Sequence, residues 1–168
     1  MTALPIVTMV DVRDRVMQLC ELIALPSPYT PGTAYRNLSE CSWSDDQMSA
    51  YVVEALGRGS QYEYTDSVTS YLTRDTIRIT LYLNHICDES YSKDWDNIDL
   101  AERAKAYVVH FFVARPTLVF EGDQLVELGR INVASAPRTA ETTGSIPKHR
   151  SIIFVMPVEF RNFSRQTE

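Results

Sequence analysis

The side chains that most often carry out catalysis are few in this sequence and lie far apart. It has three histidines, His85, His110 and His149, and none has a second histidine at the spacing of a zinc-binding helix. No Gly-x-Ser-x-Gly motif is present to expose a serine nucleophile. A histidine without such partners is more often structural than catalytic. We therefore expect no catalytic residue and a protein that is not an enzyme.

Acidic side chains cluster at residues 88–89 and 94–99, which raises the question of a metal site. A calcium loop of the EF-hand type needs glycine at its sixth position and glutamate at its twelfth. Counted from Asp94, these positions hold Asp99 and Lys105. The acids fit the start of a helix better, because carboxylates there meet the positive end of the helix dipole. We predict no metal site; a small metal- or ligand-binding domain or enzyme is the alternative from another functional class.

A cofactor motif is also missing. Gly57, Arg58 and Gly59 resemble a fragment of a nucleotide-binding loop, but no third glycine and no helix follow them. Glycines in such a place are typical of a bulge in a strand. We therefore predict no cofactor.

The cysteines indicate a reducing compartment. Cys20, Cys41 and Cys87 are odd in number and widely spaced, with no Cys-x-x-Cys pair. Cys20 falls on the apolar face of a predicted helix, where we expect it to be a small buried side chain.

Composition places the chain among ordinary globular proteins. Its 168 residues, 45% hydrophobic and 23% charged, predict one domain over 1–168. The net charge of −6 argues against specific binding to nucleic acid or to an anionic membrane. We expect no signal peptide, no membrane span and a soluble protein, because neither a charged leader nor about 18–20 consecutive apolar residues occurs.

Two helices must position any site. Apolar residues at steps of three and four predict a helix over 9–24, with Thr8 and Asp11 as a capping box. A second helix is predicted over 97–115, with a broad apolar face and Pro116 after its end. That face comprises Leu100, Ala104, Tyr107, Val108, Phe111 and Phe112.

Strands are predicted over 49–64, 75–84, 125–134 and 151–163. The first is one long or bent strand, the second alternates cleanly, and the two are expected to pair antiparallel. The last is apolar on both faces over 152–156, as in a central strand. Pro157 has no N–H to donate, so pairing on that side should break or bulge there. The order of elements predicts an α+β fold with a mostly antiparallel sheet of about four strands and both helices packed on one face.

Two long loops, at about 25–47 and 135–150, are predicted to project and to make partner contacts. The candidate contact residues are the aromatics of the first loop and the basic residues of the second, namely Tyr29, Tyr35, Trp43, Arg138, Lys148 and Arg150. Residues 1–100 carry 7 basic and 15 acidic side chains, whereas residues 101–168 carry 9 and 7. Regions of opposite charge on one subunit could meet between neighbouring copies, and an ordinary solvated loop is the alternative.

The order and lengths of these elements resemble the tail-terminator, or tail-completion, proteins of long-tailed bacteriophages. The resemblance covers nearly the whole chain and carries no diagnostic motif. It lies in the first helix, the proline-containing stretch, strands entering at 48–53 and 74–84, the helix at 97–115 and a final pair of strands ending over 154–160.

The resemblance implies a structural protein of the virion neck, assembled in the host cytoplasm, which forms a ring of six copies on the head-proximal end of the tail tube and joins tail to head. Its partners would be itself, the tail tube protein and the head–tail connector proteins, and DNA would pass through the ring without specific binding. The long first loop departs from the smaller family members, so a head–tail adaptor or stopper is the alternative within this class.

Overall fold

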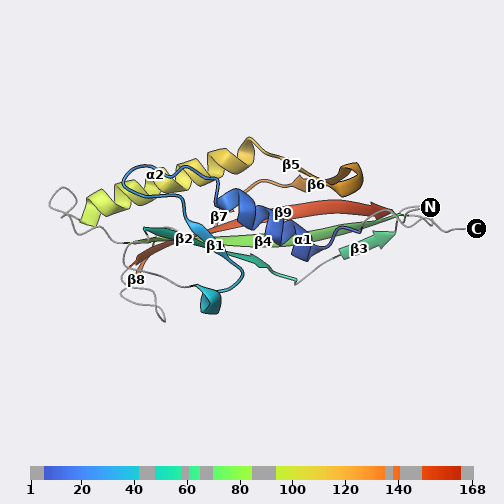
Figure 1. Ribbon diagram of the computed structural model, residues 1–168, viewed down its shortest axis with the longest axis horizontal. Coiled ribbons are helices and arrows are strands. Elements are labelled where there is room, and N and C mark those ends of the chain that lie inside the picture. The colour runs from blue at the N-terminus through green and yellow to red at the C-terminus, as the bar shows by residue number, and fades with distance from the viewer. Residues whose placement is uncertain are drawn as a thin grey trace, which may run out of the picture.

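The computed structural model describes residues 6–41, 48–57, 61–64, 70–84, 94–134, 138–140 and 149–163. Within these residues the chain forms an elongated molecule of two helices and one long, curled sheet (Figure 1). The helices are α1 (Met9–Cys20) and α2 (Asp94–Val113). The strands are β1 (Thr33–Tyr35), β2 (Ser49–Ala55), β3 (Gln61–Tyr64), β4 (Ser70–Asn84), β5 (Thr117–Phe120), β6 (Gln124–Leu128), β7 (Asn132–Val133), β8 (Arg138–Ala140) and β9 (His149–Phe163).

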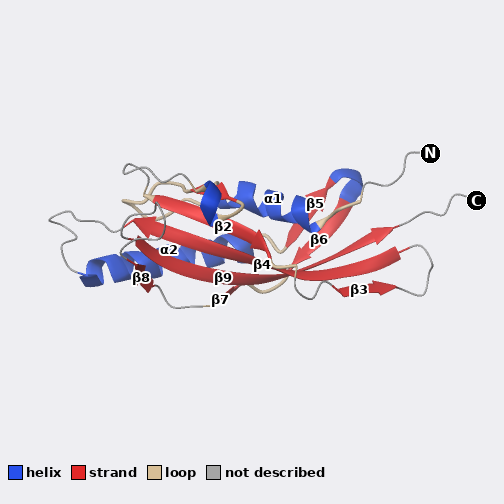
Figure 2. Cartoon of the chain, turned by 90° about the horizontal axis from the view of Figure 1, so that it is seen from below, coloured by secondary structure: helices blue, strands red, loops and turns tan. Residues whose placement is uncertain are grey.

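Two long antiparallel strands form the centre of the sheet. β4 and β9 pair over their whole length, from Ser70 opposite Phe163 to Asn84 opposite His149. The main path of the sheet is β1-β2-β4-β9-β6-β5, with β3 added to β4 and with β7 and β8 added to β9 (Figure 2). β1 runs parallel to β2, and every other pairing is antiparallel.

The predicted fold class is therefore wrong. We predicted an α+β fold with a mostly antiparallel sheet of about four strands and both helices packed on one face. The described residues instead form a mixed sheet of nine strands that curls into a half-barrel. The strands that the pattern missed, β1, β5 and β8, have three or four residues each, which is too short for alternation to identify them.

Glycines account for two further differences between the predicted and observed strands. The predicted strand over 49–64 is divided into β2 and β3, and Gly57 after β2 has a φ of 61°, outside the strand region. The predicted strand over 125–134 is divided into β6 and β7 around Gly129, whose added Cβ would lie 2.9 Å from the Cβ of Pro157. A larger residue would therefore push β6 away from β9 at this point.

The prediction for Pro157 is confirmed. Pairing with β4 continues through this residue, which lies opposite Thr76. On the other side of β9, β7 pairs as far as Val155 and β6 pairs only from Val158. Between them the Pro157 carbonyl accepts a 2.7 Å hydrogen bond from the Gly129 N–H. The proline thus lies where one neighbouring strand replaces another, as its missing donor requires.

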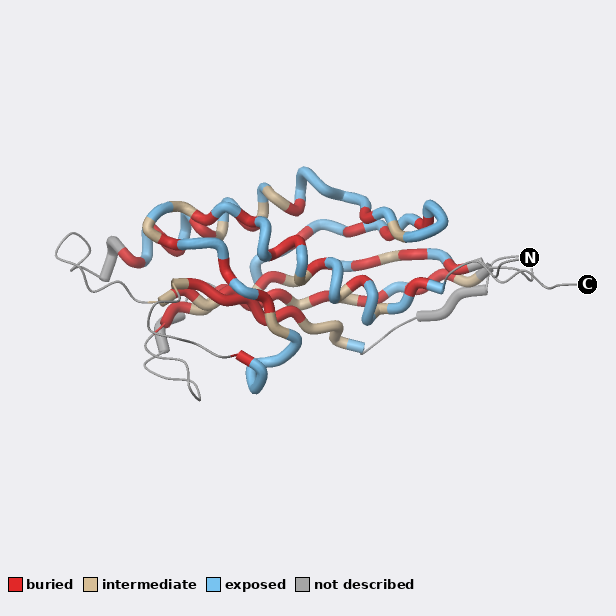
Figure 3. The backbone as a smooth tube through the Cα atoms, in the orientation of Figure 1, coloured by how far each residue is buried: buried red, intermediate tan, exposed pale blue. Residues whose placement is uncertain are grey.

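The core lies between the helices and the inner face of the sheet, which we define by alternate residues of β4 and β9. These side chains are fully buried: Ile77, Ile79, Leu81, Leu83, Ile152, Phe154 and Met156. The register places Ile79 beside Phe154 and Leu81 beside Ile152, so the apolar residues of both strands share one face. Figure 3 shows this buried stripe running through the centre of the molecule.

Both helices contribute to this core. α1 begins as predicted, because Thr8 and Asp11 form a reciprocal capping box with the backbone. It ends at Cys20, earlier than the predicted residue 24, where the N–H groups of Leu22 and Ile23 donate to carbonyls three residues back. α2 buries Leu100, Ala104, Val108 and Phe112, and it ends two residues before the predicted 115.

Candidate functional site

The described structure places the predicted contact residues in different surroundings. Tyr29 is only 4% exposed and packs into the chain's own core, while Tyr35 lies in β1 and packs against the small cluster of Cys41 and Ala50. Arg150 lies in β9 with 6% of its surface exposed, whereas we predicted it in a projecting loop. Arg138 belongs to β8, of which only the backbone is described.

Trp43 and Lys148 lie outside the described residues, as does His85. The contacts proposed for these side chains therefore stay predictions. Of the other histidines, His149 is buried and its ring meets the Tyr82 ring edge to face, with centroids 5.2 Å apart. His110 lies in the last turn of α2, on the outer side of that helix.

The nucleophiles of the core are held in their neutral forms. Cys20 is fully buried in α1, as predicted, and burial raises the pKa of its thiol far above the ordinary value. Burial likewise raises the pKa of the Tyr51 hydroxyl. In the parts of the chain that the structure describes, no group of three His, Cys, Asp or Glu side chains could hold a metal ion.

An apolar groove lies between the end of α1 and the outer side of α2. It has a volume of about 750 Å³, and its lining includes Leu22, Ile23, Tyr107, His110, Phe111 and Arg115. Leu22 is 69% exposed and Tyr107 is 50% exposed, although both are large and apolar. We call this surface the apolar groove.

The segment after α1 is fixed by its own contacts. The N–H of Ala34 in β1 donates a 3.0 Å hydrogen bond to the Glu21 carboxylate. The buried ring of Tyr29 anchors the same segment between these points, and the backbone N–H of Tyr29 donates to the carbonyl of Pro26. Leu22 is thus held outward by a turn whose two sides are tied to the fold.

The helical period explains the other wall. Tyr107 and Phe111 are four residues apart, so they lie on the same side of α2, and Arg115 follows two residues after the end of that helix. Arg115 lies with its guanidinium carbon 3.7 Å from the centroid of the Phe111 ring, and it donates to the Phe111 carbonyl at 3.1 Å. We predicted both Tyr107 and Phe111 on the core face. Tyr107 is instead half exposed, whereas Phe111 is partly buried, packs against the core and also borders the groove.

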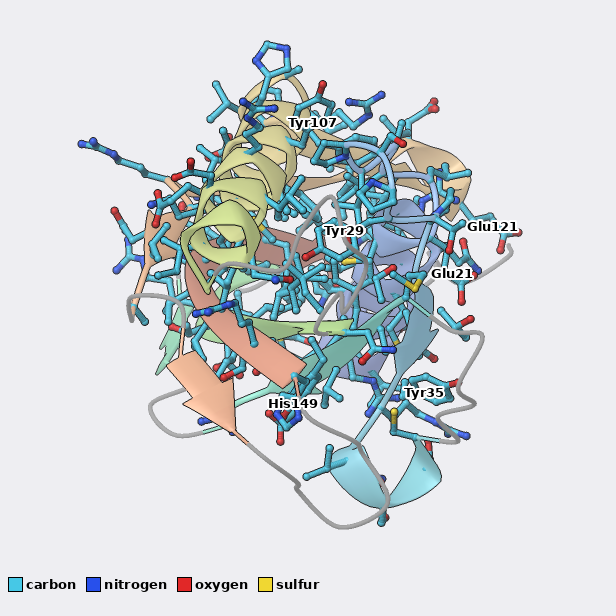
Figure 4. The ribbon with its side chains drawn as sticks, turned by 90° about the vertical axis from the view of Figure 1, so that its left-hand side faces the viewer. Glu21, Tyr29, Tyr35, Tyr107, Glu121 and His149 are labelled. Atoms are coloured by element: carbon cyan, nitrogen blue, oxygen red, sulfur yellow. The ribbon has the colours of Figure 1, made fainter. Side chains whose placement is uncertain are left out.

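A second groove lies between the start of α1 and the β5–β6 hairpin, with a volume of about 430 Å³. Its lining combines exposed apolar residues with three carboxylates and includes Ile6, Asp11, Asp14, Arg15, Val119 and Glu121. We call it the acidic groove. Figure 4 shows Glu121 at the side of the molecule, while Tyr107 lies at its top.

A buried polar junction holds the acidic groove in place. The side-chain oxygen of Asn162 accepts from the Val7 N–H at 3.0 Å and from the Gln124 side chain at 3.1 Å. Its amide donates to the Val7 carbonyl at 2.9 Å. The end of β9 thereby joins the segment before α1 to the β5–β6 hairpin. Sequence reasoning missed this junction because its partners lie 155 residues apart.

Neither protein-family models nor curated proteins give a match to this sequence. No helix in the described part of the chain is long and apolar enough to cross a membrane.

Proposed function

We propose that this chain is a structural subunit of the neck of a long-tailed bacteriophage. It assembles with copies of itself into a ring that caps the head-proximal end of the tail tube and joins tail to head. The phage assignment rests on the order of elements in the sequence, which resembles that of tail-terminator proteins. The assembly role rests on the exposed apolar groove.

That groove carries the proposal because exposing large apolar side chains costs free energy. Burying one such side chain is worth about 1.5–3 kcal/mol. Leu22 and Tyr107 remain exposed, whereas the central side chains of the core, such as Ile79 and Phe154, are completely buried. Contiguous exposed apolar surface on a well-packed protein marks a place where another molecule binds.

The reactive groups that are buried in the core also agree with a binding role. The buried Cys20 and Tyr51 are poor nucleophiles, since their raised pKa values keep them protonated. A structural subunit works through repeated surface contacts and needs no such group.

Electron microscopy of the purified chain tests the proposed function, alone and mixed with tail tubes of the phage that carries its gene. We expect ring-shaped density at one end of each tube. Density at the portal vertex of filled heads, with bare tube ends, would assign the chain as an adaptor or stopper instead. Binding to neither tubes nor heads would contradict the proposal.

A further inference from the structure

We propose that the apolar groove of one copy binds the acidic groove of a second copy, so that the chain associates head to tail. This inference rests on the proposed function, because it names the two surfaces through which copies would join. It assigns the partner of both grooves as another molecule of the same chain.

The apolar groove has the features of a binding pocket for an apolar anchor. Leu22 and Tyr107 stand exposed on its two walls, and the Phe111 ring lies beside them. Aromatic side chains at the centre of an interface commonly carry most of the binding free energy. Arg115 adds a positive charge at this border, and within the described chain its guanidinium meets the Phe111 ring and carbonyl rather than a carboxylate.

The acidic groove offers the complementary surface. Val119 is 57% exposed in β5 and Ile6 is exposed opposite it, which supplies apolar side chains to enter the first groove. Glu121 follows directly on the exposed end of β5. Asp11 and Asp14 line the groove from α1. Asp11 caps that helix through Thr8, and Asp14 pairs with Arg13. Arg15 is the one basic residue of the described lining. The carboxylates outnumber it, and Glu121 is the one nearest to the exposed Val119 in sequence. Carboxylates beside an apolar patch would meet Arg115 when the apolar parts come together.

Net charge selects this pairing over other contacts between copies. Each chain carries a net charge of −6, so most encounters between two copies are repulsive. An encounter that places Arg115 of one copy against the carboxylates of another reverses that sign locally. Charge therefore favours the contact between unlike grooves and disfavours contact between two acidic grooves.

The two grooves lie on different sides of the molecule, as the positions of Tyr107 and Glu121 in Figure 4 show. A contact between them joins two different surfaces. Two joined copies therefore still present one unused apolar groove at one end and one unused acidic groove at the other. Such heterologous contacts build closed rings or open filaments, whereas a contact of like surfaces stops at a dimer.

The test uses two variants, each with one groove blocked. Tyr107→Glu places a negative charge in the apolar groove, and Val119→Arg places a positive charge in the acidic groove. Each variant alone should lose self-association by about thirtyfold or more, because a central contact is lost and a like charge is added. Val133→Arg in β7, an exposed site that lines neither groove, is the matched control and should associate like wild type.

The decisive sample is an equal mixture of the two blocked variants, measured by light scattering after circular dichroism has shown that both are folded. Tyr107→Glu keeps its acidic groove and Val119→Arg keeps its apolar groove. The mixture should therefore form a species of twice the 19.1 kDa monomer mass and grow no further.

Two results would overturn the inference and leave the proposed function standing. One is wild-type assembly with both blocked variants assembling equally well, and the other is a mixture that stays monomeric while wild type assembles. A wild-type chain that stays monomeric at every concentration, also with tube ends present, would contradict the inference and the proposed function together.

Discussion

The inner face of the sheet and the apolar groove are both built from large apolar side chains, but only the inner face buries them completely. On the inner face, Ile79 of β4 and Phe154 of β9 lie side by side and are completely buried. In the groove, Leu22 and Tyr107 remain exposed even though α1 and α2 both contribute to the same core nearby.

This difference separates the apolar residues that stabilise the fold from those that are available to bind another molecule. Positions on α2 that face the sheet, such as Ala104 and Val108, are small enough to let the helix pack closely. Tyr107 lies on the neighbouring row with its ring half exposed, while Phe111 both packs against the core and borders the groove. If this separation is correct, substitutions in the two regions should have opposite effects on stability and on self-association.

The largest effect on stability is expected at the centre of the inner face. Phe154→Ala should lower the free energy of unfolding by about 3–5 kcal/mol, because it leaves a cavity between β4 and the helices. Urea denaturation measures the change, and Val119→Ala, at an exposed site of β5, is the control. Equal losses in the two variants would show that the inner face is not the main source of stability.

A smaller loss is expected at the polar junction that supports the acidic groove. Asn162→Ala removes both partners of the buried Val7 backbone and should cost about 2–3 kcal/mol. Hydrogen exchange at the Val7 amide should accelerate at the same time. Unchanged exchange at that amide would mean that Asn162 does not hold the segment before α1.

The sequence alone predicted the long elements, in which the pattern of apolar residues extends over many positions. β4 and both helices could be found because their apolar residues recur with one spacing over several turns or pleats, and β9 because of its continuous apolar run at 152–156. The inner face followed from the same alternation, through Ile77, Ile79 and Leu81. Short strands carry too few residues for a period, so the parallel strand β1 and the curl of the sheet could not be predicted.

The grooves could not be predicted for a different reason. A stripe of apolar residues on α2 shows that the helix is amphipathic, but not which of its rows the sheet will cover. Tyr107 and Val108 are adjacent in sequence, yet one is half exposed and the other is buried. That choice depends on where α1 ends and on the turn that holds Leu22, both of which are tertiary features.

The cap of α1 should contribute about 1 kcal/mol. Thr8→Ala removes the side chain that accepts from the Asp11 N–H and pairs with its carboxylate, whereas Thr8→Ser keeps both interactions. Thermal unfolding of the two variants measures the difference. A loss of similar size in Thr8→Ser would show that the hydroxyl is not what stabilises the start of the helix.

The smallest effect on stability is expected in the apolar groove. Tyr107→Gln should change the free energy of unfolding by no more than about 0.5 kcal/mol, since the ring is half exposed and glutamine suits a helix. Its neighbour Val108, changed to alanine, should cost about 2 kcal/mol. A large loss of stability in Tyr107→Gln would mean that the groove belongs to the core after all.

Light scattering of the wild-type chain over a wide range of concentrations tests most simply whether its copies associate with one another. We expect the mass to rise from 19.1 kDa to a defined multiple of it, or the monomer to join a ring once tail tube ends are added. A mass of 19.1 kDa at every concentration, unchanged by tube ends, would contradict this expectation.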